Sequence, residues 1–250
     1  MNRLNLDLSH EQEASPLNLL LCFLAGIHPG SQQRLIATVP EVAEFLTSNP
    51  LPENQLTQLY RVRYPDLRSD PVELFVNLVR NVFGQEEACC HFESTVEQVS
   101  LGDVRYANRL FFEVAVRDGR PFNERLFRES LVSSSSIQER VLFNPLNLVF
   151  RLIDCDTSLP LSISSVIELR PSVREFSLLS AISCYELVGV VVRAHSGAFR
   201  AFSLFCGEWR TNYQGRLVVC DETPPFSEEG TPYLLLYKMK KRTHGDITVN

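Results

Sequence analysis

The chain has 250 residues and a formal net charge of −6 at pH 7, with 44% hydrophobic and 22% charged residues. This is the composition of an ordinary globular protein, and the length allows a buried core without disulfide or metal support. The longest apolar run, residues 19–27, is about half of what a membrane-spanning helix needs and follows an acidic flank, so neither a membrane span nor a secretory signal is expected.

The first third of the chain has the pattern of α-helices. Residues 16–27 are apolar on all sides, and they follow Ser15 and begin at Pro16, residue types that favour a helix start. This pattern predicts a helix buried on most sides. Residues 40–48 also begin at a proline and place their apolar side chains on one face, which predicts an amphipathic helix.

A further helix is predicted over residues 70–83. Asp70 is a favourable N-cap, Pro71 suits the first helical position, and Glu73 can complete a capping box. The apolar residues of this segment recur at helical spacing and form one stripe, at Leu74, Phe75, Leu78, Val79 and Val82. The stripe predicts that the helix packs one face against a core.

From about residue 92 the pattern changes to short β-like runs. They lie at residues 92–100, 109–117, 147–154, 161–169, 185–194, 201–206, 216–221 and 233–239. One predicted helix, over 120–131, interrupts them and again opens at a proline. Residues 133–139 are predicted to be a loop, and residues 224–232 a turn-rich connection. Helices followed by a mostly antiparallel sheet, in separate blocks, indicate the α+β class.

Basic residues are outnumbered, with 24 Lys and Arg against 30 Asp and Glu. A protein that binds duplex nucleic acid usually carries a basic excess or a basic face. One tight basic cluster lies near the end of the chain, where a solvated terminus is favoured over a nuclear-import or phosphate-binding patch. It comprises Lys238, Lys240, Lys241 and Arg242. Four arginines around the predicted helix are interpreted as a solvated face: Arg117, Arg120, Arg125 and Arg128. Neither nucleic acid nor a membrane is an expected partner.

The seven cysteines, an odd number in a chain without a signal peptide, indicate free thiols in a reducing intracellular compartment. None of them forms a Cys-x-x-Cys pair. The adjacent Cys89, Cys90 and His91 would point apart on either a helix or a strand, so a structural zinc site is not expected. No cofactor and no metal are predicted.

Several short motifs, taken in order, resemble those of one protein family over about residues 5–240. A strand ends in His195-Ser-Gly197, and the next strand begins at Ala201 and Phe202. Trp209 and Tyr233-Leu-Leu-Leu-Tyr237 follow, and upstream Asp70-Pro-Val-Glu73 opens a helix. This order resembles that of the catalytic domain of ubiquitin-specific proteases.

The resemblance implies the α+β fold of the papain-like cysteine-protease superfamily, with a helical thumb, an antiparallel β palm and fingers. It implies a single domain over residues 1–250, with the thumb over about 5–91, the fingers and palm over about 92–240 and a tail over 241–250. The two Cys-x-x-Cys pairs of the family's zinc ribbon are absent, and their places correspond roughly to residues 100–103 and 133–136. The fingers are therefore expected to be reduced to a hairpin.

The resemblance also assigns the family's catalytic triad to positions whose residue types differ. The nucleophilic cysteine corresponds to Glu11, the general-base histidine to Ala201, and the orienting Asn or Asp to Tyr213. Arg200 replaces a glycine beside the base. A cysteine protease needs a thiolate, an imidazole and an orienting group within hydrogen-bond reach. The chain is therefore expected to be an inactive member, and not an enzyme.

No nearby residue offers an obvious replacement for the triad. No cysteine precedes Cys22, which falls inside the first predicted helix, and no histidine lies between His195 and His244. His195 matches a turn motif of the family, not its base. His10, beside the triad position at 11, is interpreted as a solvated loop residue.

Three functions follow. The favoured one is an interaction scaffold within a larger intracellular assembly, nuclear or cytoplasmic. Ubiquitin binding without cleavage stays open but is not favoured, because Arg200 adds positive charge near the arginines of the ubiquitin tail. The third is an active cysteine hydrolase or deubiquitinase with a rearranged site, in which Cys206 or Cys220 would pair with His195. A thiol in the middle of a strand would lack an activating environment.

Overall fold

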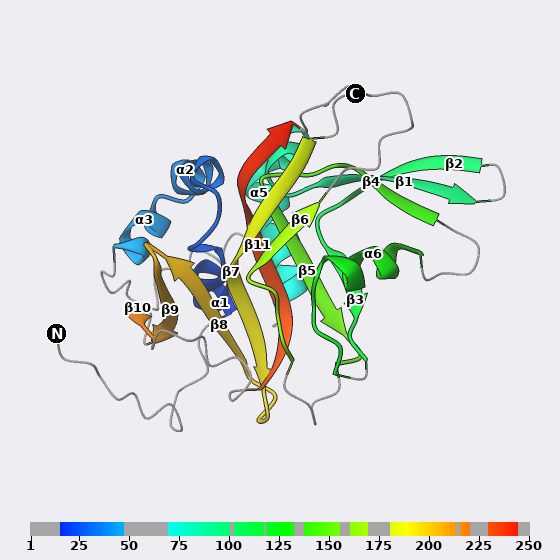
Figure 1. Cartoon of the computed structure of the whole chain (residues 1–250). Helices are drawn as coiled ribbons and strands as arrows, with labels where there is room; N and C mark the ends of the chain where they lie inside the picture. Colours follow the sequence, from blue (N-terminus) through cyan, green and yellow to red (C-terminus); the bar gives the residue numbers. More distant parts are fainter. Residues whose placement is uncertain are drawn as a thin grey trace.

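The computed structural model describes residues 16–47, 70–100, 103–117, 119–132, 138–155, 161–169, 181–213, 216–220 and 230–244. It has the expected α+β architecture, with most helices early in the chain and the strands after them (Figure 1). The helices are α1 (Pro16–Leu24), α2 (Pro29–Thr38), α3 (Glu41–Leu46), α5 (Pro71–His91) and α6 (Glu124–Val132). Within these ranges, no helix combines the length and apolar composition needed to cross a membrane.

The strands form two sheets. The strands are β1 (Ser94–Ser100), β2 (Asp103–Arg109), β3 (Phe112–Ala115), β4 (Gln138–Phe143), β5 (Asn147–Ile153), β6 (Val166–Leu169), β7 (Ala181–Ala194), β8 (Phe199–Phe205), β9 (Glu208–Tyr213), β10 (Arg216–Val219) and β11 (Gly230–His244). The larger sheet, here the palm sheet, has the order β10-β9-β8-β7-β11-β5-β3, and β6 also pairs with β7. The smaller, here the fingers sheet, has the order β2-β1-β4 and extends to the right in Figure 1. Among the described strands, β3 and β5 are parallel, and the other neighbours are antiparallel.

The helix start predicted at Asp70 is confirmed. Its Oδ1 accepts a hydrogen bond from the Val72 N–H at 2.7 Å, and its carbonyl accepts from the Leu74 N–H at 3.1 Å. The predicted apolar stripe of this helix, α5, is buried throughout, and α1 is buried at every described position from Asn18 to Leu24. The cap and the apolar stripe therefore account for α5, and the apolar composition on all sides accounts for the burial of α1.

Two cores lie on opposite faces of the palm sheet, because alternate residues of each strand point to opposite sides. On β11, Leu234 and Leu236 join the core shared with α1 and α5. Leu235 and Tyr237 join the core shared with α6. The second core is aromatic, with edge-to-face rings at centroid distances of 5.0–5.7 Å among Phe112, Phe122, Phe127, Phe150 and Tyr237.

Helix α2 was not predicted from the sequence. Pro29 occupies the start of the helix, and Nδ1 of His28 accepts a hydrogen bond from the Gly30 N–H at 3.2 Å. Burial, with a smaller contribution from Lys238, lowers the pKa of His28, which favours the neutral ring that can accept this bond. Histidine is not among the usual capping residues, which is why the pattern was not recognised.

Strands β2, β4 and β9 were also missed, and the fingers hold β4 in addition to the expected hairpin. In β2 nearly every residue is exposed, so no apolar alternation marks it. The predicted loop at 133–139 falls largely outside the described residues, but Gln138 and Glu139 begin β4. Helix α6 begins three residues after Pro121, and its cap is Asn123, whose Oδ1 accepts from the Leu126 N–H at 3.0 Å.

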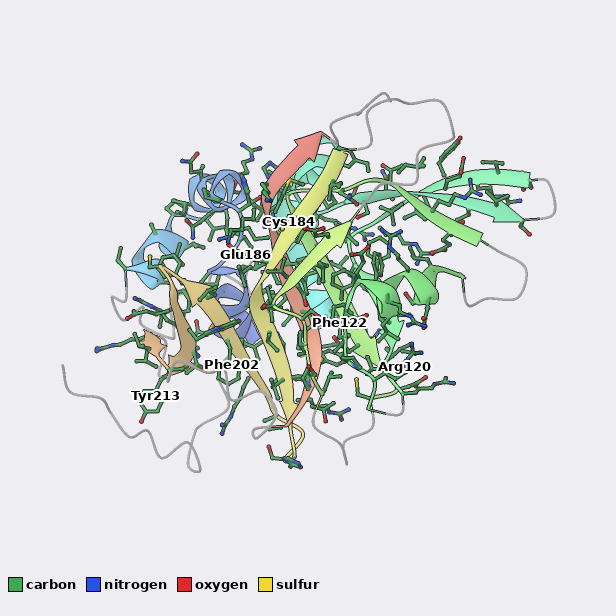
Figure 2. All side chains as sticks on the ribbon, viewed as in Figure 1. Arg120, Phe122, Cys184, Glu186, Phe202 and Tyr213 are labelled. Atoms are coloured by element: carbon green, nitrogen blue, oxygen red, sulfur yellow. The ribbon has the colours of Figure 1, made fainter. Side chains whose placement is uncertain are left out.

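The basic cluster near the end of the chain is not a solvated terminus, contrary to expectation. It lies in β11, which pairs with β7 as far as His244 and so continues past the start of the expected tail at 241. The Nζ atoms of Lys238 and Lys240 lie 3.2 and 3.4 Å from the carboxylate of Glu186 on β7. Figure 2 labels Glu186 on this strand. The cluster is therefore part of the sheet surface.

Helix α5 is kinked at Gly84, whose φ of 66° and ψ of 177° are not helical and are accessible essentially to glycine alone. Gly84→Ala is expected to lower the free energy of unfolding by about 1–2 kcal/mol, although no atom lies within 4 Å of the added Cβ. Urea denaturation measures the loss. Arg80→Ala, at an exposed position before the kink, is the control and should change stability by less than about 0.5 kcal/mol. Equal effects of the two changes would contradict the kink.

Candidate functional site

Helix α1 lies directly against the palm sheet, and two glycines make this possible. A Cβ on Gly189 of β7 would lie 2.7 Å from the carbonyl oxygen of Phe23 on α1. A Cβ on Gly26, just after α1, would lie 2.8 Å from the carbonyl oxygens of Val188 and Leu204. This close approach holds α1 over β7 and β8, and the resemblance places the general base on β8.

Position 201 faces α1. Ala201 belongs to the core shared with α1, whereas its neighbour Phe202 belongs to the core on the opposite face. The alanine is 2% exposed, and its carbonyl accepts hydrogen bonds from Thr211 Oγ1 at 2.9 Å and Cys22 Sγ at 3.3 Å. A methyl group cannot accept or donate a proton, so this position offers packing and no acid–base chemistry.

The cysteine beneath Ala201 is not a nucleophile in this arrangement. Cys22 lies in α1 and is 0% exposed, and its thiol is directed at the backbone of β8 and β9. Burial raises the pKa of the Cys22 thiol, and the nearby Cys220 adds to this effect. Because the thiolate is the reactive form, a raised pKa makes the sulfur inert. The interpretation of Cys22 as an interior helix residue is confirmed.

Tyr213 is the last residue of β9, is half-buried, and pairs with Arg216 of β10 (Figure 2). The preceding residue, Asn212, is 9% exposed and pairs with Leu217, which belongs to the core shared with α1. Phe202 pairs with Thr211, so extending that register by one residue brings Asn212 beside Ala201. The strands thus place an amide, and not the phenol, next to position 201.

Asn212 is the residue that the sequence analysis missed at this site. It lies three residues after Trp209, one short of the spacing used to assign the orienting residue, so a shift of one residue would have found it. Its Oδ1 has no hydrogen-bond partner within the described ranges. An amide can orient an imidazole, but the neighbouring position holds a methyl group.

The histidines with described side chains lie elsewhere. His195 is exposed in the turn between β7 and β8, and β8 carries Ala201 about 10 Å away from that turn. His91, at the end of α5, has its Nδ1 2.8 Å from Ser31 Oγ, a pairing that looks catalytic. Ser31 is 0% exposed, however, and its oxygen also accepts from Asn147 Nδ2 at 2.8 Å. This group is a buried structural network.

The two alternative cysteine–histidine pairs are separated by the length of a strand. Cys206 lies in the turn after β8, at the opposite end of this strand from His195, and seven strand residues span about 20 Å. Cys206 was expected to lie in the middle of a strand, but it is exposed in a turn. The Cys220 N–H donates to the carbonyl of Trp209, which places Cys220 near that same far end. Neither thiol can reach His195.

The N-terminus of α5 is tied to the palm beside this site. The Tyr233 hydroxyl of β11 lies 3.3 Å from Asp70 Oδ2, while the guanidinium of Arg151 lies 5.5 Å from the centre of the Tyr233 ring. Arg151 also pairs with Glu113 at 2.9 Å. Burial, followed by the charge of Asp70, raises the pKa of Tyr233, so the phenol stays neutral and can donate to the carboxylate. These contacts join the thumb to the palm.

Several predicted site residues cannot be placed. Glu11, the position of the nucleophile, lies outside the described residues, as do His10 and Gln214. Among the residues that the structure does describe, no three His, Cys, Asp or Glu side chains are grouped to hold a metal ion. Of the two places assigned to the absent zinc ribbon, only Ser100 and Asp103 are described, at the ends of β1 and β2.

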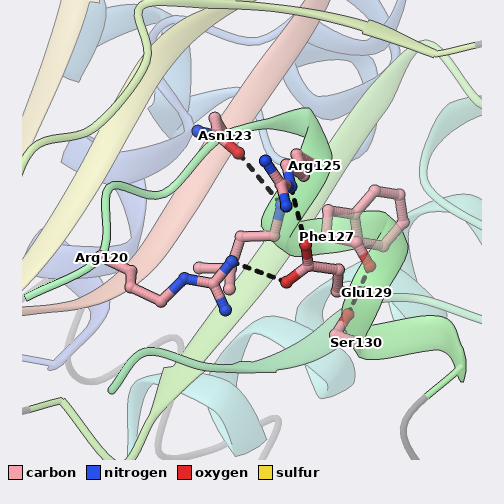
Figure 3. Close-up of polar contacts among 7 residues, drawn as sticks. Arg120, Asn123, Arg125, Phe127, Glu129 and Ser130 are labelled. Atoms are coloured by element: carbon pink, nitrogen blue, oxygen red, sulfur yellow. Dashed lines mark hydrogen bonds and ion pairs between the residues drawn. The ribbon is translucent and has the colours of Figure 1, made fainter. Parts of the chain in front are cut away.

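The arginines around α6 are matched by carboxylates. Glu129 accepts hydrogen bonds from Arg120 at 2.7 Å and Arg125 at 2.9 Å, and these bonds lower its pKa (Figure 3). Arg128 pairs with Glu124 at 2.7 Å, and Arg117 with Asp154 at 2.9 Å. The arginines predicted to form a solvated face do so, and their charge is locally neutralised.

Comparison with known proteins places the fold. No family model and no curated protein matches the chain. Among solved structures, the Ubp8-Sgf11-Sgf73-Sus1 SAGA DUB module matches with a TM-score of 0.67 and 14% identity, covering 94% of this chain and 67% of the other. The same module bound to monoubiquitin gives 0.64 and 12%, covering 93% and 68%. The yeast SAGA DUB module with a mutated Sgf73 gives 0.61 and 13%, covering 92% and 65%.

The chain therefore spans about two thirds of the length of the chains that it matches. Ubp8 is a ubiquitin-specific protease, so the expected fold, ubiquitin-specific-protease-like within the α+β class, is confirmed. At 12–14% identity the likeness concerns the fold alone.

Proposed function

We propose that this chain is a catalytically inactive ubiquitin-specific-protease-like domain that acts as a protein–protein interaction scaffold within an intracellular complex. The observation that carries the proposal is Ala201. Its side chain points toward α1 from the position that the resemblance assigns to the general base, and the space is filled by core packing. A fold can outlast its active site in this way, because packing and catalysis depend on different residues.

The surroundings of Ala201 support the same proposal. Amide cleavage by a cysteine enzyme needs a thiolate activated by an imidazole. The nearby thiol, that of Cys22, is buried and inert, and His195 is held in a distant turn. Asn212 could serve as the third member of a triad, but without the other two it has no catalytic role.

The scaffold role is supported by the kind of structure that the chain resembles. The matched solved structures are modules in which Ubp8 is assembled with Sgf11, Sus1 and Sgf73. By analogy we propose that this chain also works with protein partners in a larger nuclear or cytoplasmic assembly. Ubiquitin itself is not favoured as the partner, since Arg200 brings positive charge to the strand that would receive the basic tail of ubiquitin.

The test of inactivity is intact-mass analysis after incubation with ubiquitin bearing a C-terminal electrophile. We expect no adduct from the purified chain, and a stoichiometric adduct from an active ubiquitin-specific protease run in parallel. The electrophile without ubiquitin controls for simple labelling of the exposed Cys90 and Cys206. An adduct that forms only with the ubiquitin probe would overturn the proposal and identify the nucleophile by peptide mapping.

The scaffold role is tested separately by affinity capture from cell extract followed by size-exclusion chromatography. We expect at least one protein to co-elute with the chain at a fixed stoichiometry. Ubiquitin as that stable component would favour the non-cleaving ubiquitin binder instead. A chain that elutes alone would contradict the scaffold role while leaving the inactivity result intact.

A further inference from the structure

Strand β2 forms the outer edge of the fingers sheet. Across the described residues it pairs with β1 on one side only, and its seven residues, Asp-Val-Arg-Tyr-Ala-Asn-Arg, are mostly exposed. In Figure 1 the β1–β2 hairpin extends away from the palm. An unpaired edge presents free N–H and C=O groups that can pair with another strand, and proteins normally cover or disrupt such edges.

The open face of the fingers sheet concentrates exposed apolar side chains. Val96 and Val141 on β1 and β4 pair with each other and join the aromatic core. Residues one position along the strands point the other way. This face carries Val104 and Tyr106, and also Phe143, which a register shift in β4 pairs with Thr95; they are three of the five large hydrophobic side chains found exposed in the described ranges. The Tyr106 hydroxyl lies 3.5 Å from Oε1 of Glu97 on β1, but the residue is still 65% exposed, which is a high value for an aromatic side chain.

The sequence of β2 is complementary to itself when read in the antiparallel direction. If two copies pair about a two-fold axis at Tyr106, Asp103 of each lies opposite Arg109 of the other. Val104 then faces Asn108 of the second copy, and the two Tyr106 rings face one another. Opposite charges and aromatic side chains are favourable cross-strand pairs, and the symmetry makes each charge pair occur twice.

Neighbouring two-fold registers lack this match. Centring the axis on Arg105 places two arginines directly opposite each other. Centring it on Ala107 places Arg105 opposite Arg109 of the second copy, twice. Like charges directly opposite each other destabilise a sheet. Shifts by an odd number of residues would turn the apolar side chains of the two copies to opposite faces.

We propose that the β2 edge is a homodimer interface, in which two copies join antiparallel about Tyr106 and merge their fingers sheets. The proposal stands apart from the inactivity of the site and from the identity of any other partner. The ion pairs that β2 makes now do not oppose it. Asp103 pairs with Arg105 at 2.9 Å with both side chains more than 60% exposed, and such exposed pairs contribute little. Arg109 binds Glu139 and still has one third of its side chain exposed.

The interface is small, because one strand pair and its side chains bury less area than a typical stable complex. We therefore expect a reversible dimer that is half dissociated at roughly 10 µM. Sedimentation analysis between about 1 and about 100 µM, which brackets this midpoint, should show the monomer converting to dimer as the concentration rises. A chain that stays monomeric throughout would overturn the proposal.

Charge reversal tests the register. Asp103→Arg places arginine opposite Arg109 twice, so we expect dimerisation to weaken at least about tenfold. Arg109→Asp creates the corresponding acidic pairs and should do the same. Mixing the two variants, however, restores opposite charges at both positions, so a heterodimer should form at close to the wild-type concentration. Circular dichroism tests whether each variant is folded. Arg109→Asp loses the contact with Glu139, and if that variant does not fold, Asp103→Arg alone tests the register.

Arg216→Glu is the matched control. Arg216 is an exposed arginine on β10, the edge strand at the end of the palm sheet, so reversing it changes net charge without touching β2. It should dimerise like the wild type. A dimer that survives Asp103→Arg, or one that Arg216→Glu abolishes, would overturn the assignment of the interface.

Discussion

Replacing Gly189 by alanine is expected to destabilise the protein by about 3 kcal/mol or more, close to the loss of the folded state for a marginally stable domain. The added Cβ would lie 2.7 Å from the carbonyl oxygen of Phe23 and 3.0 Å from Cβ of Leu236. The first of these is backbone of α1, which cannot rotate away as a flexible side chain would. The helix must therefore lift from β7, and the core between them must open.

Urea denaturation of Gly189→Ala and of the wild type measures this effect, and Gly30→Ala is the matched control. Gly30 lies in α2, and an added Cβ there would meet only the His28 ring at 3.5 Å, an ordinary contact. In a helix, alanine replacing glycine should be neutral or stabilising by up to about 1 kcal/mol. If Gly189→Ala unfolded at the same urea concentration as the wild type, α1 would not pack on β7 as described.

The helix predicted best from the sequence is one in which capping residues and the apolar pattern indicate the same helix. In α5, Asp70, Pro71 and an apolar stripe point to the same start and the same buried face, and the structure has both. The kink at Gly84 was not predicted, because the predicted helix ended at residue 83 and its continuation to His91 beyond this glycine was not foreseen. It becomes evident only from the backbone angles.

The missed strands share a physical reason. β2 is exposed along nearly its whole length, and β9 mixes Trp209, Arg210 and Thr211 without apolar alternation. Periodicity detects burial, so strands at or near the edge of a sheet give a weak signal. β7 and β11, by contrast, lie between other strands and were predicted, although shorter than they are.

At the candidate site, position 201 was assigned through the resemblance, which matches Ala201 and Phe202 to the start of a strand in the family, and the structure turns Ala201 toward α1. The partner on β9 was not found, because its place depends on how the Cys206–Gly207 turn sets the register of two strands. These residues have φ angles of 53° and 81°, and the register that follows brings Asn212, not Tyr213, beside Ala201. Counting from Trp209 could not anticipate this turn.

The polar interactions that hold the helices to the sheet lie away from the candidate site. The buried polar groups that hold α2, α5 and β5 together converge on Asn147, far along the chain from Ala201 and independent of it. Oδ1 of Asn147 accepts from the His28 N–H at 2.8 Å, and Nδ2 donates to Ser31 Oγ at 2.8 Å and to the His91 carbonyl at 3.0 Å. Loss of a catalytic group leaves this network unchanged.

Asn147→Asp is accordingly expected to cost about 3 kcal/mol at neutral pH, although the two side chains have nearly the same shape. Asn147 is 0% exposed, and the substitution places an acceptor where Nδ2 donates to the His91 carbonyl. Asn81→Asp, at an exposed position of α5, makes the same chemical change without burial and should alter stability by less than about 0.5 kcal/mol.

The pH dependence separates the buried charge from a merely altered shape. Burial raises the pKa of the introduced carboxyl in the folded state above its unfolded value of about 3.9. The folded state then binds a proton more readily than the unfolded state, so the destabilisation is greatest above the folded pKa and shrinks as the pH falls toward 4. Urea denaturation of Asn147→Asp and wild type at several pH values measures the difference. A constant gap at all pH values would mean that the carboxyl is not held as a buried charge in this network.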